Sequence, residues 1–281
     1  MSKVAAIQMA SGPNVKANLA EADKLIKIAV QQEAELVVLP ENFAIMGVSE
    51  QDKVKIAERD SEHTGEQGML QTFLQQTAAK YGIWLVGGTI PVASEEQGKV
   101  YASCLLHDSS GQRIARYDKI HLFDVTIEAS NESYTESDTI TPGDHVVVVD
   151  TPFGRLGLAI CYDLRFPELF RAMVEEGMEI CALPSAFTSL TGKVHWESLL
   201  RSRAIENLSF MVAADQGGYH VGGRETHGDS MIVDPWGLVL NRLPHGTGVV
   251  VANIDISKLE HTRKMFPALE HKQFVCQHHS K

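Results

Sequence analysis

The sequence contains few cysteines, and no two of them stand close together. Its 281 residues include four, Cys104, Cys161, Cys181 and Cys276, with no C-x-x-C pair. This spacing matches neither a zinc site nor the disulfide framework of a small secreted domain. Cys104 and Cys181 lie inside apolar runs, which is typical of packing residues. We therefore expect a cytoplasmic protein with reduced thiols.

Long apolar runs are also absent. The N-terminus has a single Lys and then only a short apolar run, Val4 to Ile7, before Gln8. A signal peptide needs a longer apolar region, and nothing approaches the roughly 20 apolar residues of a transmembrane helix. We expect neither a secretory leader nor a membrane partner.

Positive charge is scarce as well. The chain has 25 Lys and Arg against 36 Asp and Glu, which gives a formal net charge of −11. Such a chain repels the phosphates of a nucleic acid unless a local basic patch attracts them, and no run of Lys or Arg supplies one. The twelve histidines form no H-E-x-x-H motif, and His278 and His279 stand in a polar tail. We expect no nucleic-acid partner and no metal.

Short apolar runs do alternate with amphipathic segments, which predicts alternating strands and helices. The first half contains, in order, a strand over Val4 to Met9, a helix over Asn18 to Gln31, a strand over Leu36 to Leu39, a helix that begins at Met69 and ends at Gly82, a strand over Ile83 to Val86, and a hairpin with its turn at Asp108 to Gly111.

The second half repeats this order, and Glu35 to Phe43 parallels Glu179 to Phe187 in sequence. Its expected elements are a strand over Leu156 to Ile160, a helix over Pro167 to Glu176, a strand over Ile180 to Leu183 stopped by Pro184, a helix over His195 to Glu206, a strand over Phe210 to Ala214, and a hairpin turn at Asp234 to Gly237.

Two βαβαββ halves therefore form one α/β domain over residues 1–281, with a tail from about residue 257. Strands buried on both faces, alternating with helices, predict two sheets packed face to face with helices outside.

Three reactive side chains stand where such a fold places ligands. Cys161 follows a strand and precedes a helix, where backbone N–H groups and the helix dipole favour a thiolate; a lone cysteine there is otherwise a small buried hydrophobe. Glu41 follows a strand of the other half, and ligands bind beyond the carboxyl ends of such strands. Lys119 stands among Tyr117 and Ile120, so apolar neighbours could hold its ammonium.

Three segments resemble the signature regions of the nitrilase superfamily of carbon–nitrogen hydrolases. They are Pro40–Phe43, Tyr117–Leu122 and Cys161–Glu168, and they carry Glu, Lys and Cys in that order. The resemblance covers nearly the whole chain. It implies a four-layer αββα sandwich that forms a homodimer or a larger homo-oligomer, and a small amide hydrolysed without a cofactor.

The resemblance also implies a role for each residue. Cys161 would attack the amide as nucleophile, and Glu41 would move protons as base and acid. Lys119 and the backbone N–H of Tyr162 would face the oxyanion, where one such donor is worth about 3 kcal/mol. Glu136 aligns with a second glutamate of the superfamily that would orient Lys119 or a water.

Several of these assignments have alternatives. Glu136 is equally well a solvated acid in a polar loop over Glu128 to Asp138. Ala186 and Phe187, in the segment P-S-A-F, are placed at the oxyanion or substrate side of the site on the resemblance alone. His121 is expected to be a packed or supporting histidine rather than half of a Cys–His dyad.

Arg165 is expected to pair with a carboxylate such as Glu168, or alternatively to bind a substrate carboxylate. The glycine-rich stretch Gln216 to Gly223 is either a substrate-selecting loop or a plain connection.

Four further segments resemble the branch of the superfamily that hydrolyses deaminated glutathione. They resemble the ω-amidase branch almost as closely. These segments are Pro184–Phe187, His195–Glu197, Arg201–Asn207 and His227–Gly237. Both branches act on amides of small α-keto dicarboxylates. A catalytically silent binding protein on the same fold is the alternative from another functional class.

Overall fold

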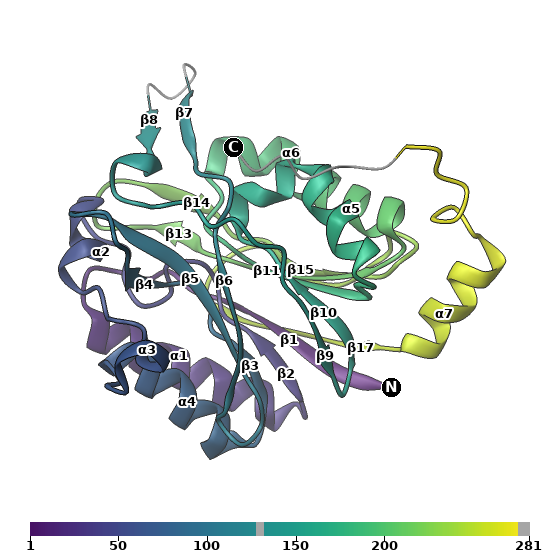
Figure 1. Ribbon diagram of the computed structural model, residues 1–281, viewed down its shortest axis with the longest axis horizontal. Helices are drawn as coiled ribbons and strands as arrows, with labels where there is room; N and C mark the ends of the chain where they lie inside the picture. The colour runs from purple at the N-terminus through teal and green to yellow at the C-terminus, as the bar shows by residue number, and fades with distance from the viewer. Residues whose placement is uncertain (128–131, 275–281) are drawn as a thin grey trace.

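Two β-sheets form the centre of the computed structural model, which describes residues 1–127 and 132–274 (Figure 1). The first sheet has seven strands in the order β17-β1-β2-β3-β5-β4, with β6 paired to β5. Its strands are β1 (Ser2–Gln8), β2 (Leu36–Val38), β3 (Trp84–Val86), β4 (Ile90–Ala93), β5 (Val100–His107), β6 (Arg113–Asp118) and β17 (Gly248–Ile254).

The second sheet has six strands in the order β16-β15-β12-β11-β10-β9. They are β9 (Val148–Thr151), β10 (Gly154–Leu158), β11 (Ile180–Ser185), β12 (Phe210–Asp215), β15 (Ser230–Val233) and β16 (Val239–Leu243). Two small hairpins lie outside both sheets: β7 (Asp124–Ile127) with β8 (Glu132–Thr135), and β13 (Gly217–Tyr219) with β14 (Glu225–His227).

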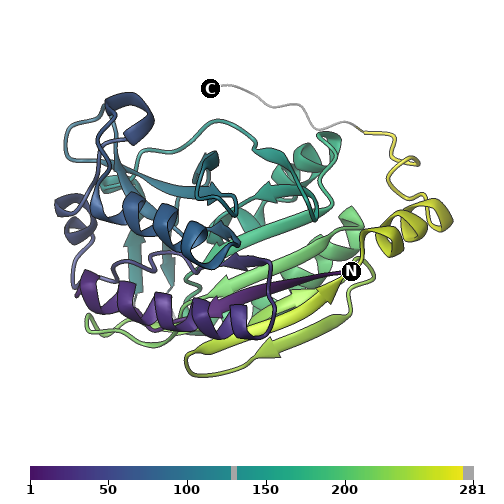
Figure 2. The ribbon, with the colours of Figure 1, turned by 90° about the horizontal axis from the view of Figure 1, so that it is seen from below.

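Helices cover the outer faces of both sheets, so the expected αββα sandwich is confirmed (Figure 2). Helices α1 (Val15–Gln31) and α4 (Met69–Tyr81) cover the first sheet, and α5 (Pro167–Glu175) and α6 (Ser189–Asn207) cover the second. The remaining helices are α2 (Gln51–Lys55), α3 (Ser61–Thr64), α7 (Ile256–Met265) and the 3₁₀ turns η1 (Glu136–Asp138) and η2 (Cys161–Arg165).

The two halves match in topology, as the sequence repeat predicts. In the first sheet β1, β2 and β3 are parallel, and in the second β10, β11 and β12 are parallel. Each half then adds antiparallel strands. The carboxyl ends of β2 and of β10 therefore lead to the loops that carry Glu41 and Cys161.

The second half gives a strand to the sheet of the first half. Strand β17, at the end of the second half, pairs antiparallel with β1 along its full length, from Ser2↔Ile254 to Gln8↔Gly248. Separating the halves would strip this edge strand from the first sheet. The crossing strand supports our proposal that the chain folds as one domain.

Two apolar layers hold the sandwich together. The inner layer lies between the sheets and extends under α5 and α6, where Phe170 and Trp196 are fully buried. The outer layer joins the first sheet to α1 and α4 through residues such as Leu25 and Leu74. Burial of apolar area at about 25 cal/mol per Å² is the main stabilising contribution in such layers.

Strand β11 and helix α6 differ from the expectation. Strand β11 continues through Pro184, because β10 has already ended opposite Ala182 and Pro184 pairs only with β12. Helix α6 begins at Ser189 rather than His195. Its first turns contain Gly192, which is a weak helix former. Because Gly192 has no Cβ, its backbone packs directly against His227. Tertiary packing therefore outweighs local propensity there.

The expected polar loop over residues 128–138 contains strand β8, which pairs with β7 through Tyr134 and Val125. The expected tail likewise begins as helix α7, which Arg263 fastens to the body. Its guanidinium donates to the carbonyls of Leu208 and Met178 at 3.0 and 2.7 Å. Cys276, His278 and His279 lie outside the described residues.

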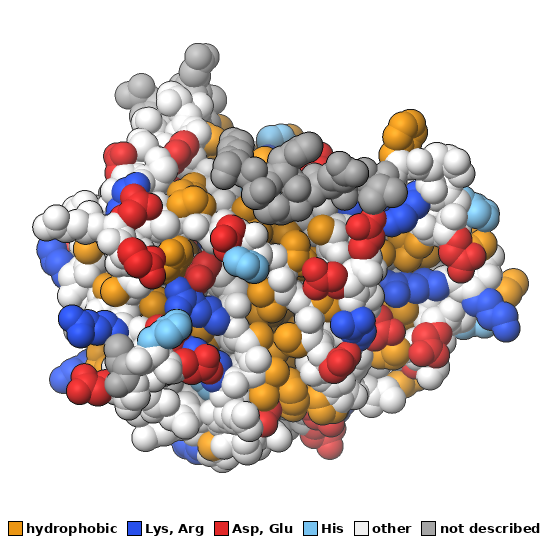
Figure 3. All heavy atoms as spheres, viewed as in Figure 1, with side chains coloured by type: hydrophobic (Ala, Val, Ile, Leu, Met, Phe, Trp, Pro, Cys, Tyr) orange, Lys and Arg blue, Asp and Glu red, His pale blue; other side chains and the backbone are white. Residues whose placement is uncertain are grey.

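The described part of the chain contains no helix both long and apolar enough to cross a membrane. On the face shown in Figure 3, the basic side chains of the described residues are interspersed with acidic ones.

Gly88 provides a test of how tightly the loop before Glu41 is packed. It has φ of +55°, and a Cβ there would lie 2.2 Å from the carbonyl oxygen of Pro40. Gly98 also has a positive φ, +83°, but a Cβ there meets nothing within 4 Å. In urea unfolding we expect Gly98→Ala to cost about 1 kcal/mol of unfolding free energy. Gly88→Ala should cost about 1–3 kcal/mol more. Equal losses would contradict this packing.

Candidate active site

Cys161 occupies an unusual backbone turn. Strand β10 ends at Leu158, and three residues later Cys161 has φ of +47°, a conformation that costs energy for any residue but glycine. The fully buried carboxylate of Asp163 fixes the turn by accepting from the N–H of Ile160 at 2.8 Å and from the hydroxyl of Tyr117 at 2.7 Å.

The expected packed role of His121 is confirmed. Its Nδ1 lies 2.7 Å from Oδ1 of Asp163, and its ring stacks on Phe166 with centroids 3.7 Å apart. It therefore supports the turn that carries Cys161 and forms no Cys–His dyad.

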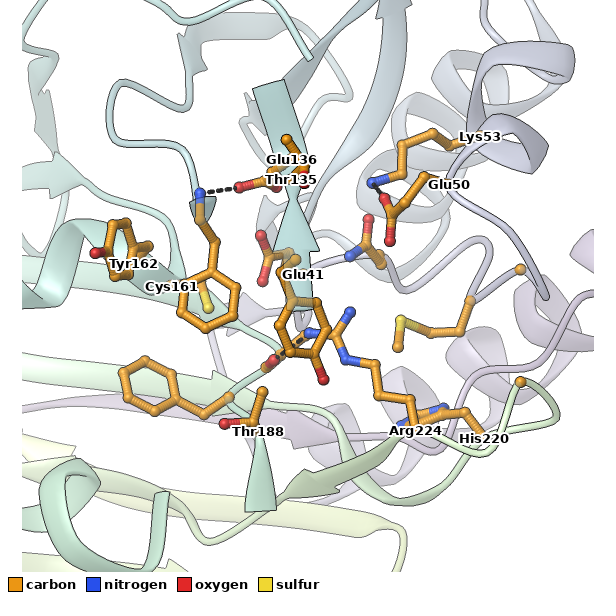
Figure 4. Close-up of a pocket in the computed structure, with 18 of the residues that line it drawn as sticks. Glu41, Glu50, Lys53, Thr135, Glu136, Cys161, Tyr162, Thr188, His220 and Arg224 are labelled. Atoms are coloured by element: carbon orange, nitrogen blue, oxygen red, sulfur yellow. Dashed lines mark hydrogen bonds and ion pairs between the residues drawn. The ribbon is translucent and has the colours of Figure 1, made fainter. Parts of the chain in front are cut away.

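Glu41 is held by its backbone just beyond β2. Its carbonyl oxygen accepts from Nε2 of Gln216 at 3.0 Å. The next residue, Asn42, has φ of +55° and donates its N–H to the hydroxyl of Thr89 at 2.8 Å. These contacts leave the Glu41 carboxylate directed into the site (Figure 4).

Lys119 follows β6 directly and is buried, with 2% of its surface exposed. Its Nζ donates to Oε1 of Glu41 at 2.8 Å and to both carboxylate oxygens of Glu136 at 2.8 and 2.9 Å. Its backbone N–H donates to the carbonyl of Ala102 at 3.1 Å. The ammonium is therefore fixed between two carboxylates from different parts of the chain.

The structure distinguishes between the alternatives for Glu136. Its side chain is only 12% exposed, and besides Lys119 it accepts from the N–H of Phe123 at 2.8 Å. Burial alone would raise the pKa of Glu136, but the Lys119 ammonium outweighs it and holds the pKa below its usual range. Glu136 is a charged partner of Lys119 rather than a solvated loop residue.

Glu41, Lys119, Glu136 and Cys161 line one cavity of about 560 Å³. In Figure 4 the Cys161 side chain and the Glu41 carboxylate lie in the same hollow, with Glu136 above them. Residues far apart in sequence are therefore brought together at the carboxyl ends of the strands, as the repeat predicts.

Cys161 differs electrostatically from the expectation. The pKa of its thiol is raised well above the usual range, first by burial and then by the Glu41 carboxylate; Lys119 and the backbone N–H of Ala186 act in the opposite direction. Helix α5 begins only at Pro167, so its dipole is too distant to dominate. The resting thiol is protonated at neutral pH, and the expected thiolate needs a base to form.

Lys119 remains charged despite its burial. Burial by itself lowers the pKa of Lys119, but the carboxylates of Glu136 and Glu41 outweigh it and hold the pKa well above its usual range. The site therefore contains a fixed ammonium next to a neutral thiol.

Tyr162, Ala186 and Phe187 also line the cavity, but their polar groups differ in availability. The N–H of Phe187 donates to Oδ1 of Asp215 at 2.9 Å, so it is already occupied and cannot serve an oxyanion. The Ala186 N–H faces the sulfur of Cys161. Phe187 contributes its ring, which packs on Trp196 with centroids 4.8 Å apart.

Arg165 does not pair with Glu168 as expected. Its guanidinium lies 3.2 Å from Nδ1 of His195 and over the rings of Tyr162 and Phe187, at 5.9 and 5.3 Å from their centroids. Among residues 1–127 and 132–274 no carboxylate lies within ion-pair distance of it, and its side chain lines the cavity instead.

The sequence analysis did not identify several residues of the cavity wall. They are Lys53, Arg224 and the threonines Thr188 and Thr191. The buried Asp215, whose Oδ1 accepts from the N–H of the wall residue Phe187, was not identified either. Only Asp215 carries a signal that could have indicated it, since it ends a parallel strand. His220, Gly222 and Gly223 do line the cavity, so the stretch Gln216 to Gly223 forms part of its wall rather than a plain connection. No cluster of three potential metal ligands occurs in the described ranges.

Comparison with known proteins agrees with this geometry. A family model described as carbon–nitrogen hydrolase matches residues 3–264. The deaminated glutathione amidase of Synechocystis sp. is 43% identical over 274 residues, which cover 96% of this chain and 98% of that protein.

Solved structures are similar over the same length. The C. elegans NitFhit protein matches with a TM-score of 0.87 and 36% identity, over 97% of this chain but only 65% of that one. Saccharomyces cerevisiae Nit3, described as a member of branch 10 of the nitrilase superfamily, matches with a TM-score of 0.86 and 32% identity over 97% of both chains. The chain therefore belongs to the carbon–nitrogen hydrolase family of the nitrilase superfamily.

Proposed function

We propose that this protein is a cofactor-free amidase that hydrolyses the amide of a small α-keto dicarboxylate of the deaminated glutathione type. One observation carries the proposal: the thiol of Cys161 shares a small cavity with a buried ammonium that two carboxylates hold in place. The 43% identity to a protein named deaminated glutathione amidase supports the choice of substrate.

Proton transfer from Cys161 to Glu41 begins the reaction. An amide is a poor electrophile, so its attack requires the thiolate, and the raised thiol pKa means that a base must generate it. The Glu41 carboxylate faces the same hollow and bonds Lys119 through one oxygen, Oε1. Its other oxygen accepts no hydrogen bond from the described residues, so it takes the proton as the sulfur attacks the carbonyl carbon.

Negative charge then develops on the carbonyl oxygen of the substrate. The Lys119 ammonium and the Tyr162 backbone N–H would stabilise this oxyanion, each worth about 3 kcal/mol in a buried site. Glu41 and Glu136 hold the Lys119 ammonium in place, so its positive charge acts on the oxyanion although its N–H groups already face the two carboxylates. Glu136 acts here as a positioning residue.

Collapse of this intermediate breaks the C–N bond. Glu41 returns its proton to the departing nitrogen, which leaves as a neutral amine, and the acyl group remains on Cys161 as a thioester. Glu41 then accepts a proton from water as the water attacks the thioester. The carboxylic acid is released and the proton returns to the thiol, so each cycle consumes one water.

Arg165 is placed to bind a carboxylate of the acyl half of the substrate. Its guanidinium lies on the Tyr162 side of Cys161 and has no carboxylate partner in the described part of the chain. A planar guanidinium binds a carboxylate through two parallel hydrogen bonds, which fixes orientation as well as charge.

We further propose a cytoplasmic homodimer or larger homo-oligomer. The apolar side chains of Val194 and Ile205 on α6 are exposed, and Trp236 packs against Phe266 on the same surface while both remain more than half exposed. Ile205 lies directly against the turn that follows Trp236. A connected apolar patch of this kind supports an interface between subunits.

Substrate preference tests the proposed function. We expect a higher kcat/KM for deaminated glutathione than for α-ketoglutaramate, with Cys161→Ala inactive on both. The alanine variant should unfold at nearly the same temperature, because it removes one sulfur atom and no large apolar group. A reversed preference would favour an ω-amidase. No turnover of either amide, nor of other small linear amides, would favour the silent binding protein.

Glu41→Gln and Glu136→Gln form a matched pair, since each removes one carboxylate from Lys119. We expect Glu41→Gln to lower kcat by about 10²–10⁴-fold, because an amide cannot move the proton. Glu136→Gln should cost at most about 10²-fold, through displacement of Lys119. Near-normal turnover in Glu41→Gln would contradict its role as base.

Iodoacetamide alkylation of the same variants gives an independent readout of the thiol. In the wild type the rate should rise with pH to a midpoint above that of an ordinary thiol, because the Cys161 pKa is raised. Removing the Glu41 carboxylate should shift that midpoint to lower pH, and Glu136→Gln should shift it less. An unshifted midpoint in Glu41→Gln would contradict the electrostatic account.

A further inference from the structure

Four cationic side chains line the cavity: Lys53, Lys119, Arg165 and Arg224. The two lysines have carboxylate partners, since Lys53 pairs with Glu50 at 2.5 Å and Lys119 is held by two glutamates. Within the described ranges neither Arg165 nor Arg224 has a carboxylate partner. The cavity therefore contains two guanidinium groups that no carboxylate of the described residues pairs with, which favours a ligand with two acidic groups.

Arg224 belongs to the β13–β14 hairpin and reaches into the cavity from its wall (Figure 4). Its Nη2 donates to the carbonyl oxygen of Ala186 at 2.9 Å, and its guanidinium lies over the ring of Tyr134, 5.2 Å from the centroid. These two contacts fix the plane of the guanidinium. Its Nε is buried and has no hydrogen-bond acceptor.

Asp215 makes no ion pair with Arg224 among the described residues. Burial raises the pKa of Asp215 well above its usual range, and Arg224 only partly opposes that shift. Burial therefore disfavours the charged form of Asp215, which would be the counter-charge of Arg224. A guanidinium that is partly removed from water without a partner charge is costly, and a carboxylate from a ligand would offset that cost.

The two arginines lie on different sides of the nucleophile. Arg165 lies over the Tyr162 ring, and in Figure 4 Arg224 is drawn on the opposite side of Cys161 from Tyr162, on the same side as Glu41, which lines the same cavity. Glu41 is the group that protonates the departing nitrogen in the proposed mechanism. The amine half of the substrate must therefore extend toward Glu41, which is the side of Arg224.

We propose that Arg224 is a specificity-determining residue that binds a carboxylate at the far end of the leaving amine, while Arg165 binds the acyl half. This inference rests on the proposed function and narrows it. The preferred substrates are amides whose amine part ends in a carboxylate, as a peptidyl amine does. Primary amides such as α-ketoglutaramate leave Arg224 without a partner and are poorer substrates.

Steady-state kinetics on three amides test the inference. They are deaminated glutathione, the same compound with the carboxylate of its amine half converted to a carboxamide, and α-ketoglutaramate. We take the ratio of kcat/KM for deaminated glutathione to kcat/KM for each of the other two amides. Arg224→Met should lower this ratio by about tenfold or more, mainly through a higher KM for deaminated glutathione. Arg224→Lys should restore part of that ratio, since it keeps the charge but not the planar fork.

Arg165→Met is the matched control, because it removes the other unpaired guanidinium. It should lower kcat/KM for all three amides by similar factors, since all three share the acyl half. If Arg224→Met also lowers kcat/KM for all three amides by equal factors, then Arg224 acts only as a structural support through Ala186. The inference is then wrong, although the proposed function stands.

Calorimetric binding to the Cys161→Ala variant separates the inference from the proposed function, because it needs no hydrolysis. We expect deaminated glutathione to bind at least about tenfold more tightly than its carboxamide, and the difference to disappear in Cys161→Ala with Arg224→Met. Equal affinity for the two compounds would overturn the inference whether or not the wild type hydrolyses either of them.

Discussion

The buried ammonium of Lys119 is the interaction on which the rest of the site depends. Three parts of the chain meet at it: the end of β6 supplies the lysine, the loop after β2 supplies Glu41, and the turn after β8 supplies Glu136. A single buried charge would be strongly destabilising, whereas this arrangement balances it with two carboxylates. Removing Lys119 would leave two buried carboxylates without a counter-charge, whereas removing either glutamate leaves Lys119 paired with the other.

Burial of Cys161 explains why the reaction needs Lys119 and its carboxylate partners. The cavity that excludes water from Cys161 also disfavours its thiolate, and the Glu41 carboxylate adds to the effect. The same carboxylate is therefore both a reason why the thiol is neutral at rest and the base that removes its proton. Charge on the sulfur arises only during attack, next to the ammonium of Lys119, where it is stabilised.

Much of this arrangement could be predicted from sequence because it depends on local patterns. Apolar runs followed by Pro40 and by Cys161 located two strand ends, and the rule that ligands bind there brought Glu41 and Cys161 together. The other features of the site could not be predicted, because they depend on burial and on contacts between residues far apart in sequence. The pKa of Cys161 depends on what covers it, and Arg224 has no local signature because its position comes from a hairpin that packs beside Ala186.

The central claim is that Cys161 carries the acyl group during amide hydrolysis. Its most direct test is to quench the wild-type enzyme in acid during turnover of deaminated glutathione and to map its peptides by mass spectrometry, with hydroxylamine added to a parallel reaction. The account predicts the α-keto acyl group on the peptide that contains Cys161 and a hydroxamate product in the parallel reaction. Turnover with no acyl group on that peptide and no hydroxamate would contradict it.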